Sequence, residues 1–229
     1  MPMPNVKITM VDKVLEIIAP HLCSGCSKIG SPLCDHCKYD IIEMPFVGCL
    51  VCFGPTSVGI CLEHNKSYKN AWIVGERHGT LLDIINAFKF QNMKAAAADL
   101  AKLLDARLPA LPVDTVVVPV PTVPGHIRER GYDHLLLIAR YFAQYRQLTV
   151  ERLLLRETTT TQHTANRETR LIQAKSAFKV TRDISSDVPY LLLDDIITTG
   201  STIDEASGLL SLNGAKTIWV GALARQPLD

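Results

Sequence analysis

The chain has 229 residues, of which 47% are hydrophobic and 21% are charged, and its formal net charge at pH 7 is +1. These values are ordinary for a soluble globular protein and leave room for one α/β domain with a small module beside it. The near-neutral charge argues against a surface that is basic throughout, as in many nucleic-acid-binding proteins, although a local basic groove stays possible.

The start of the chain predicts a short docking helix over residues 1–20, because apolar residues recur there at helical spacing before Pro20. The same region lacks the basic stretch and small-residue cleavage site of a secretory signal. No run of eighteen or more apolar residues occurs, so neither a transmembrane helix nor membrane insertion is expected. We therefore expect a cytoplasmic protein.

All seven cysteines lie between Cys23 and Cys61, in four pairs that each enclose two residues, and the last pair ends in a histidine. Such a turn places two metal ligands on one side of a knuckle, and two knuckles complete a tetrahedral zinc site. Grouping neighbouring pairs gives the ligand sets Cys23, Cys26, Cys34 and Cys37, and Cys49, Cys52, Cys61 and His64. An interleaved pairing, buried free thiols or one degenerate site are the alternatives. Because protein ligands would fill all four positions, the expected zinc ions, two in number, are structural. This stretch is glycine-rich, and we expect it to be poor in helix.

From residue 69 onward, segments with strand character alternate with segments of helical periodicity. Strands are expected over 71–75, 114–121, 150–157, 176–180, 190–196 and 216–224, and helices over 80–108 with a break near Gln91, 131–145 and 201–214. This alternation predicts an α/β fold with a mostly parallel sheet that helices cover on both faces.

The segment "YLLLDDIITTGST" (190–202) joins an apolar strand to two adjacent acids, Asp194 and Asp195, and then to a turn of small residues. In a parallel α/β sheet, ligands bind beyond the carboxyl ends of the strands. The turn leads into a helix N-terminus, whose free N–H groups and positive dipole end bind anions. The lysine-containing Walker loop of nucleoside triphosphate sites is absent. The turn therefore suits a monophosphate, and the carboxylates suit the hydroxyls of an attached sugar.

This segment resembles the phosphoribosyl-pyrophosphate (PRPP) motif of type I phosphoribosyltransferases, and the whole chain resembles the ComF family of competence-associated proteins. The order of the motifs carries the resemblance: cysteine knuckles, "AFKF" (87–90), "VVPVP" (117–121), "RERGYDHLLLIA" (128–139), the PRPP motif and "ALAR" (222–225). It implies a double zinc-ribbon module over 21–68 and a phosphoribosyltransferase-like domain over 69–229.

The resemblance also implies roles for individual residues. Asp194 and Asp195, the expected catalytic pair, would hold the ribose hydroxyls of PRPP, and Mg²⁺ would arrive mainly on pyrophosphate oxygens. The 5-phosphate would lie against Thr198, Thr199, Gly200, Ser201 and Thr202. The expected basic and lid contacts are Arg128, Arg130, Lys89, Gln162, Arg167 and Arg170.

The chain departs from the family at Asp133 and His134, which replace an amide pair, at Gln173 in the lid, and at His64 in place of a cysteine. An aspartate beside a pyrophosphate site would be unfavourable unless it faced away or met a metal. These departures concern the pyrophosphate side and any acceptor site more than the phosphate turn.

Three functions are compatible with these features. The first is an enzyme that transfers phosphoribosyl from PRPP to an acceptor in the context of competence and DNA uptake. The second is a non-catalytic module of the competence machinery that handles single-stranded DNA through its phosphates. The third is a PRPP sensor that signals to a competence-machinery protein.

Overall fold

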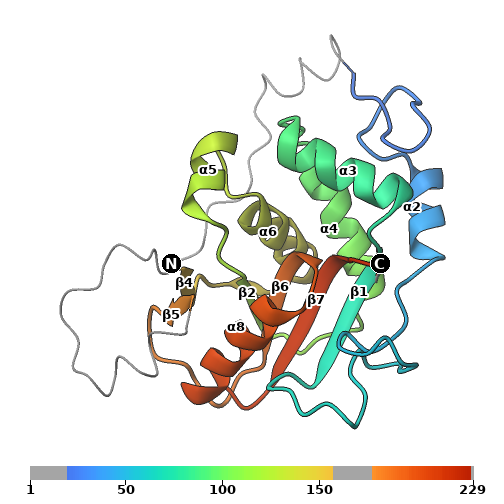
Figure 1. Cartoon of the computed structure of the whole chain (residues 1–229). Helices are drawn as coiled ribbons and strands as arrows, with labels where there is room; N and C mark the ends of the chain where they lie inside the picture. Colours follow the sequence, from blue (N-terminus) through green and yellow to red (C-terminus); the bar gives the residue numbers. More distant parts are fainter. Residues whose placement is uncertain (1–19, 157–176, 228–229) are drawn as a thin grey trace.

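A five-stranded parallel sheet in the order β1-β7-β6-β2-β3 forms the centre of the fold (Figure 1). It is seen in a computed structural model that describes residues 20–156 and 177–227. The strands are β1 (Asn70–Glu76), β2 (Val116–Pro119), β3 (Thr149–Val150), β6 (Tyr190–Ile197) and β7 (Ile218–Arg225). The pairings within this sheet are parallel. The first four residues of β6 are buried, as expected where helices cover both faces.

Helices cover both faces of the sheet, which confirms the predicted fold class. They are α2 (Asp35–Ile42), α3 (Gly79–Phe90), α4 (Ala96–Arg107), α5 (Pro124–Arg130), α6 (His134–Arg146) and α8 (Ser201–Leu212). The connections from β1 to β2 and from β2 to β3 cross the sheet in one direction, whereas the connection from β6 to β7 crosses in the other. Because such crossovers are right-handed, α4 and α6 lie on one face and α8 on the other, as Figure 1 shows.

The direction of the crossovers therefore reverses between β6 and β2, which are neighbours in the sheet. At such a reversal the loops that follow the two strands leave toward opposite faces, and a crevice opens beyond the carboxyl ends. The position of a ligand site is thus fixed by the topology before any side chain is considered.

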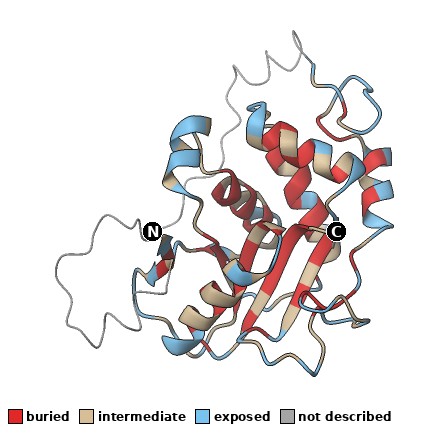
Figure 2. Ribbon diagram, viewed as in Figure 1, coloured by how far each residue is buried: buried red, intermediate tan, exposed pale blue. Residues whose placement is uncertain are grey.

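The core extends from the sheet into the cysteine-containing segment. Buried residues line the strands and the helix faces that contact them (Figure 2), and the same cluster includes Cys23, Leu33 and Leu50 from the first part of the described chain. Lys38 of α2 also forms an ion pair with the buried Asp99 of α4, with Nζ and Oδ1 separated by 3.1 Å. The segment thus packs directly against the sheet's helices.

The break expected near Gln91 separates α3 from α4, and Asn92 there has a left-handed φ of 55°. The expected helix over 1–20 and the expected lid over 157–173 lie outside the described residues. In the described part of the chain, no helix has the length and apolar character needed to cross a membrane.

Two expectations need correction. The segment 150–157 is not one strand: it divides between β3 and β4 (Leu154–Arg156), and β4 pairs antiparallel with β5 (Phe178–Val180) in a separate small sheet. Leu153 and Leu154 are buried in the same core cluster as the strands of the main sheet, so their apolar character does not tell the two sheets apart. The helix expected over 131–145 begins only at His134, after its cap residue Asp133. The cysteine segment is poor in helix, as expected, and α2 begins there directly after Cys34.

The helix α5 was also not expected, although its ends carry recognisable signals. Proline stands in its first turn, and Gly131 ends it with a left-handed φ of 77°. Both are preferred at those positions, since proline lacks the N–H that a first turn leaves unbonded and glycine adopts positive φ freely.

Replacing Phe142 by alanine is expected to lower the free energy of unfolding by about 3–5 kcal/mol, because its 0% exposed ring would leave a cavity between α6 and the sheet. The matched change Leu212→Ala, at a side chain that is 83% exposed, should cost well under about 1 kcal/mol. Urea unfolding of the two variants measures the difference. Equal losses would contradict the described packing.

Candidate functional site

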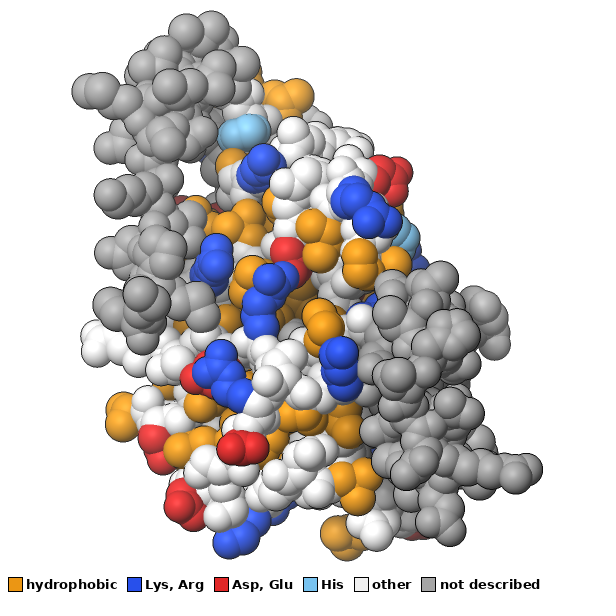
Figure 3. All heavy atoms as spheres, turned by 90° about the vertical axis from the view of Figure 1, so that its left-hand side faces the viewer, with side chains coloured by type: hydrophobic (Ala, Val, Ile, Leu, Met, Phe, Trp, Pro, Cys, Tyr) orange, Lys and Arg blue, Asp and Glu red, His pale blue; other side chains and the backbone are white. Residues whose placement is uncertain are grey.

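A cavity of about 500 Å³ opens where the carboxyl ends of β6 and β2 lie side by side. The residues that line it come from both strand ends, from the end of α3 and from the region of α5 and α6. Those used below are Lys89, Arg130, His134, Arg156, Asp194, Asp195 and Thr202. On the face of the molecule that carries α5, basic side chains are spread around acidic ones (Figure 3). The cavity occupies the position that the topology predicts for a ligand.

Asp195 is the most deeply held acid of the cavity. Its Oδ2 accepts from Nζ of Lys89 at 2.7 Å and from Nε2 of the buried His134. Burial alone would raise the pKa of this carboxyl, but the His134 hydrogen bond and the Lys89 charge outweigh burial and hold the pKa well below its usual range. Asp195 is therefore a permanent carboxylate, and among the described residues its Oδ1 has no hydrogen-bond partner.

The hydrogen bonds of His134 determine its tautomer. Arg130 carries only N–H donors, so its Nη1, at 2.9 Å from His134 Nδ1, must donate to that nitrogen. The proton of the neutral ring then lies on Nε2 and points at Asp195. Arg130, His134 and Asp195 form a continuous hydrogen-bonded chain along one wall of the cavity.

Asp194 has the opposite electrostatic character. Burial, followed by the neighbouring charge of Asp195, raises its pKa to about 7. One carboxylate oxygen accepts from the backbone N–H of Asp195 at 2.8 Å, and the side chain is only partly buried at the cavity wall. The adjacent acids thus differ in charge near neutral pH, because one has cationic and imidazole partners and the other has not.

The turn after β6 presents backbone donors toward this end of the sheet. Gly200 adopts a left-handed φ of 83° just before α8 and, as a glycine, offers no side-chain cap, although the N–H of Ser201 donates to Thr199 Oγ1 at 3.4 Å. Thr199 Oγ1 lies 3.0 Å from Ser201 Oγ, and both residues are exposed with Thr198. Thr202 lines the cavity. Uncapped N–H groups at a helix N-terminus are an anion-binding arrangement, and hydroxyls add further donors.

The structure brings together some of the predicted basic residues and separates others. Lys89 and Arg130 line the cavity, whereas Arg128 is exposed on α5 and does not. The predicted lid residues Gln162, Arg167 and Arg170 lie outside the described residues. Arg156 was not among the predicted basic residues, yet it lines the cavity, with its guanidinium 4.8 Å from the Phe178 ring centroid.

Asp133 does not line the cavity, although its Oδ1 accepts from Oγ1 of the lining residue Thr122 at 3.3 Å, so the expected conflict with an anionic ligand is reduced. Its Oδ1 caps α6 by accepting from the N–H of Leu136 at 3.2 Å, and its Oδ2 lies 2.6 Å from Arg152 Nη2. His134, by contrast, is a site residue that sequence reasoning set aside. Its contact with Asp195 spans 61 positions, so no local pattern could have indicated it.

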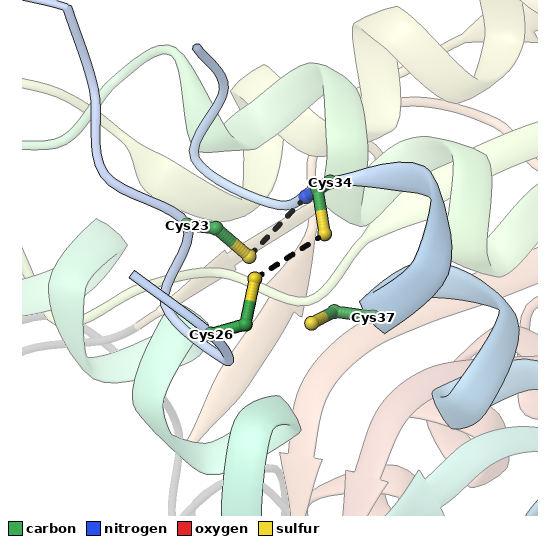
Figure 4. Close-up of side chains that lie close together, drawn as sticks. All are labelled: Cys23, Cys26, Cys34 and Cys37. Atoms are coloured by element: carbon green, nitrogen blue, oxygen red, sulfur yellow. Dashed lines mark hydrogen bonds between the residues drawn. The ribbon is translucent and has the colours of Figure 1, made fainter. Parts of the chain in front are cut away.

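The cysteines form two clusters that follow the neighbouring grouping rather than the interleaved one. The ligand atoms of each cluster lie within 4.8 Å of one another, and the cysteines are free thiols. Cys26 and Cys34 have their sulfurs 3.6 Å apart (Figure 4), and Cys52 and Cys61 have theirs 3.8 Å apart. A tetrahedron with Zn–S distances of about 2.3 Å has edges of about 3.8 Å, so both clusters fit zinc.

His64 belongs to the second cluster, with Nδ1 3.7 Å from the Cys49 sulfur. In each cluster one thiol also receives backbone N–H groups. Burial raises the pKa of Cys49, but the N–H groups of Cys52, Val51 and Cys61 outweigh it and lower the pKa to about 6. A thiolate near neutral pH is the form that binds zinc.

Asp194→Asn is expected to stabilise the protein at pH 8. Because the folded state raises the Asp194 pKa, stability is full below about pH 4 and is lost as the pH rises toward 7. The amide has no charge to bury, so the variant should regain at least about 1 kcal/mol of folding stability at pH 8. Each kcal/mol regained should raise the melting temperature by about 2–4 °C. Thermal unfolding between pH 4 and pH 8 measures the gain, which should vanish at the acid end.

Asp195→Asn is expected to have the opposite effect on stability, because the carboxylate of Asp195 has a depressed pKa and a lysine partner. Its loss leaves Lys89 buried without a counter-charge and should cost about 3–5 kcal/mol at pH 8. Two variants with the same sign of effect at pH 8 would contradict the assigned charges.

The wild-type protein is expected to carry about two zinc ions per chain, one for each tetrahedral ligand set. Cys52→Ser should release one of them and leave the first cluster loaded, and Cys26→Ser should do the reverse. Elemental analysis gives the zinc content, with thermal unfolding as a check on folding. Loss of both ions from either variant would contradict two independent sites.

Comparison with known proteins places the chain among competence proteins. No family model matches it. Competence protein F of Haemophilus influenzae is 32% identical over 92% of this chain and 93% of its own length. The DNA utilization protein YhgH is 28% identical in Salmonella typhi, over 73% of this chain and 77% of its own, and 24% identical in Escherichia coli K12, over 89% and 88%.

Solved structures give more distant matches. The allosteric regulatory enzyme of purine biosynthesis aligns with a TM-score of 0.43 and 21% identity, over 56% of this chain and 25% of that one. An adenine phosphoribosyltransferase aligns with a TM-score of 0.35 and 16% identity, over 62% and 76%. The similarity to the Haemophilus influenzae protein covers nearly the full length of both chains. The chain therefore belongs to the competence protein F family.

Proposed function

We propose that the protein binds PRPP with Mg²⁺ and transfers its phosphoribosyl group to an acceptor, in the context of DNA uptake. The observation that carries this proposal is the junction of β6 and α8. There, two acids of different charge are followed within a few residues by a helix N-terminus whose N-cap residue, Gly200, has no side chain. A sugar phosphate needs carboxylate acceptors for hydroxyls and N–H donors for a phosphate at such a spacing.

In this proposal the 5-phosphate binds the turn Thr198–Thr202, and the ribose hydroxyls donate to Asp194 and Asp195. The free Oδ1 of Asp195 suits one hydroxyl, because Oδ2 is already occupied by Lys89 and His134. Proximity of Mg²⁺, and of the positive charge that develops on the ribose ring during transfer, would favour the ionised form of Asp194.

The pyrophosphate group would extend toward the end of β2 and α5. Arg130 and Arg156 line that side of the cavity and can meet its oxygens, whereas Asp133 does not line the cavity. Mg²⁺, when bound, would neutralise part of the pyrophosphate charge, and the partly buried Asp194 offers an oxygen ligand of the kind it prefers.

Transfer would break the bond between the anomeric carbon and pyrophosphate, which leaves with the electron pair, while the acceptor forms the new bond. Positive charge develops on the ribose ring in such reactions. The carboxylates at its hydroxyls would oppose that charge, so positioning and electrostatics replace a protein nucleophile.

The second candidate is a non-catalytic role within the competence machinery. The protein would either handle single-stranded DNA or sense PRPP. The names of the relatives, competence protein F and DNA utilization protein, favour a role near DNA. Here residues 21–68 would be a metal-stabilised contact module, and residues 69–229 would bind PRPP as a regulator. PRPP binding without pyrophosphate release in the presence of any acceptor would favour this candidate.

Calorimetric titration with PRPP and Mg²⁺ is expected to show saturable binding to the wild type. The double variant Asp194→Asn/Asp195→Asn should bind at least about 100-fold more weakly, because two hydrogen bonds to charged acceptors are lost. The control is Asp183→Asn/Asp187→Asn, at exposed aspartates before β6, which should bind as the wild type does. No binding by folded, zinc-loaded wild type would refute the proposal. Pyrophosphate release with candidate acceptors then distinguishes transferase from sensor.

A further inference from the structure

Arg225, the last residue of β7 and of the "ALAR" motif, is a buried arginine beneath the phosphate turn. It is 3% exposed, and its Nη1 donates to the carbonyls of Ile197 at 3.1 Å, Thr198, and Gln226 at 3.2 Å. Among the described residues no carboxylate lies within ion-pair distance of it, and its Nε has no partner. A buried guanidinium is thus bound to carbonyls at the base of the turn, and its positive charge is not neutralised there.

The other side of the same guanidinium contacts the second cysteine cluster. Nη2 donates to the carbonyl of Leu50 at 3.0 Å, and the group lies over the Phe53 ring at 4.5 Å from its centroid. Leu50 and Phe53 each follow a ligand directly, Cys49 and Cys52 respectively. A cation–π contact is stronger when the cation is desolvated, as this buried arginine is.

The conformation of this knuckle depends on its turn. Phe53 has a left-handed φ of 61°, which is uncommon for a bulky residue, and its N–H bonds the carbonyl of Cys49 at 2.9 Å. Metal coordination by the flanking cysteines would hold the turn closed, because such knuckles fold around their ion. Without it, both contacts to Arg225 would be released together.

A second link joins the same cluster to the helix that follows the phosphate turn. Lys66, two residues after His64, forms an ion pair with Asp204 in the first turn of α8, with Nζ and Oδ2 2.5 Å apart. The N–H of Asp204 bonds the carbonyl of Gly200 at 2.9 Å, which closes that turn.

Among the described residues, no hydrogen bond or ion pair connects the first cluster to the phosphate turn. Its helix α2 contacts α3, α4 and β1, and Lys38 is paired with Asp99 on α4. The two clusters have similar chemistry but contact different parts of the fold. Loss of metal from the first cluster therefore serves as a control for loss of metal from the second.

We propose that metal in the Cys49–His64 cluster sets the conformation of the phosphate turn through Arg225, so that sugar-phosphate affinity depends on the second metal site and not on the first. The proposal rests on the proposed function for the identity of the ligand. Arg225 is a positioning residue in this arrangement: it fixes the carbonyls of Ile197 and Thr198, and its charge adds to the positive potential at the helix N-terminus.

The test compares Cys52→Ser with Cys26→Ser, each confirmed to have lost one zinc ion. PRPP with Mg²⁺ should bind Cys52→Ser at least tenfold more weakly than Cys26→Ser. Amide hydrogen exchange at Asp204 and Gln226, whose N–H groups bond the carbonyls of Gly200 and Ile197, should be at least tenfold faster in Cys52→Ser, without ligand, and unchanged in Cys26→Ser. Equal effects of the two variants on both readouts would overturn the proposal.

Arg225 is tested with both zinc ions in place. Arg225→Gln should weaken PRPP binding at least tenfold and accelerate exchange at Asp204 and Gln226. Arg225→Lys should recover part of both, because it keeps the charge and can reach one of the carbonyls. Should Arg225→Gln fail to fold, Phe53→Leu removes only the ring contact and should still accelerate exchange at the turn. Exchange at wild-type rates in a zinc-loaded Phe53→Leu and Arg225→Lys would refute the link.

The two proposals fail in different ways. If the wild type binds no PRPP, the proposed function falls, and the exchange comparison alone decides whether the second cluster controls the turn. If the wild type binds PRPP but Cys52→Ser and Cys26→Ser bind it equally, only the metal link falls.

Discussion

A charged carboxylate, that of Asp195, is buried at the end of a parallel strand, and the surrounding elements must neutralise it. Lys89 from α3 and His134 from α6 both reach its Oδ2, and Arg130 holds the imidazole from the other side. Removing the Lys89 cation would leave the carboxylate without a counter-charge in a low-dielectric environment, at a cost of several kcal/mol. The ends of α3, α5 and α6 are therefore fixed relative to β6 by electrostatics as well as by apolar packing.

The same arrangement gives the adjacent acids different chemistry. Asp195 stays ionised because its partners are cationic or donating, whereas burial and the neighbouring charge raise the pKa of Asp194 to about 7. A charged ligand can therefore change the protonation of Asp194 with little free energy near neutral pH. Because the crossover direction reverses at this point of the sheet, the acids open onto a crevice rather than onto a helix.

Most of the features that could be predicted depend on residues that are neighbours in the sequence. The strand, the two acids and the turn before α8 occupy one stretch. The hydrophobic run, the paired charges and the glycine therefore indicate a strand, an acidic site and a turn in that order. Cysteine spacing predicted two ligand sets, but only the fold decides between neighbouring and interleaved pairing. The division of 150–157 between two sheets could not be predicted, because leucines are equally apolar in the small sheet and in the main sheet.

Residues whose role depends on long-range contacts were not predictable. His134 meets Asp195 across 61 positions, and Arg225 meets Leu50 across 175. Asp133 beside His134 suggested repulsion of an anion, yet it caps α6 because the helix begins at the next residue. The helix α5 is different: its proline and glycine signals were present in the sequence, and turn chemistry could have indicated it.

The central claim is that the end of β6 and the turn before α8 form one sugar-phosphate site, and a crystal structure of the protein with PRPP and Mg²⁺ tests it most directly. We expect the 5-phosphate on the backbone N–H groups of residues 199–202, and the ribose hydroxyls on Asp194 and on Oδ1 of Asp195. Ligand bound elsewhere, or hydroxyls that contact neither acid, would contradict the account.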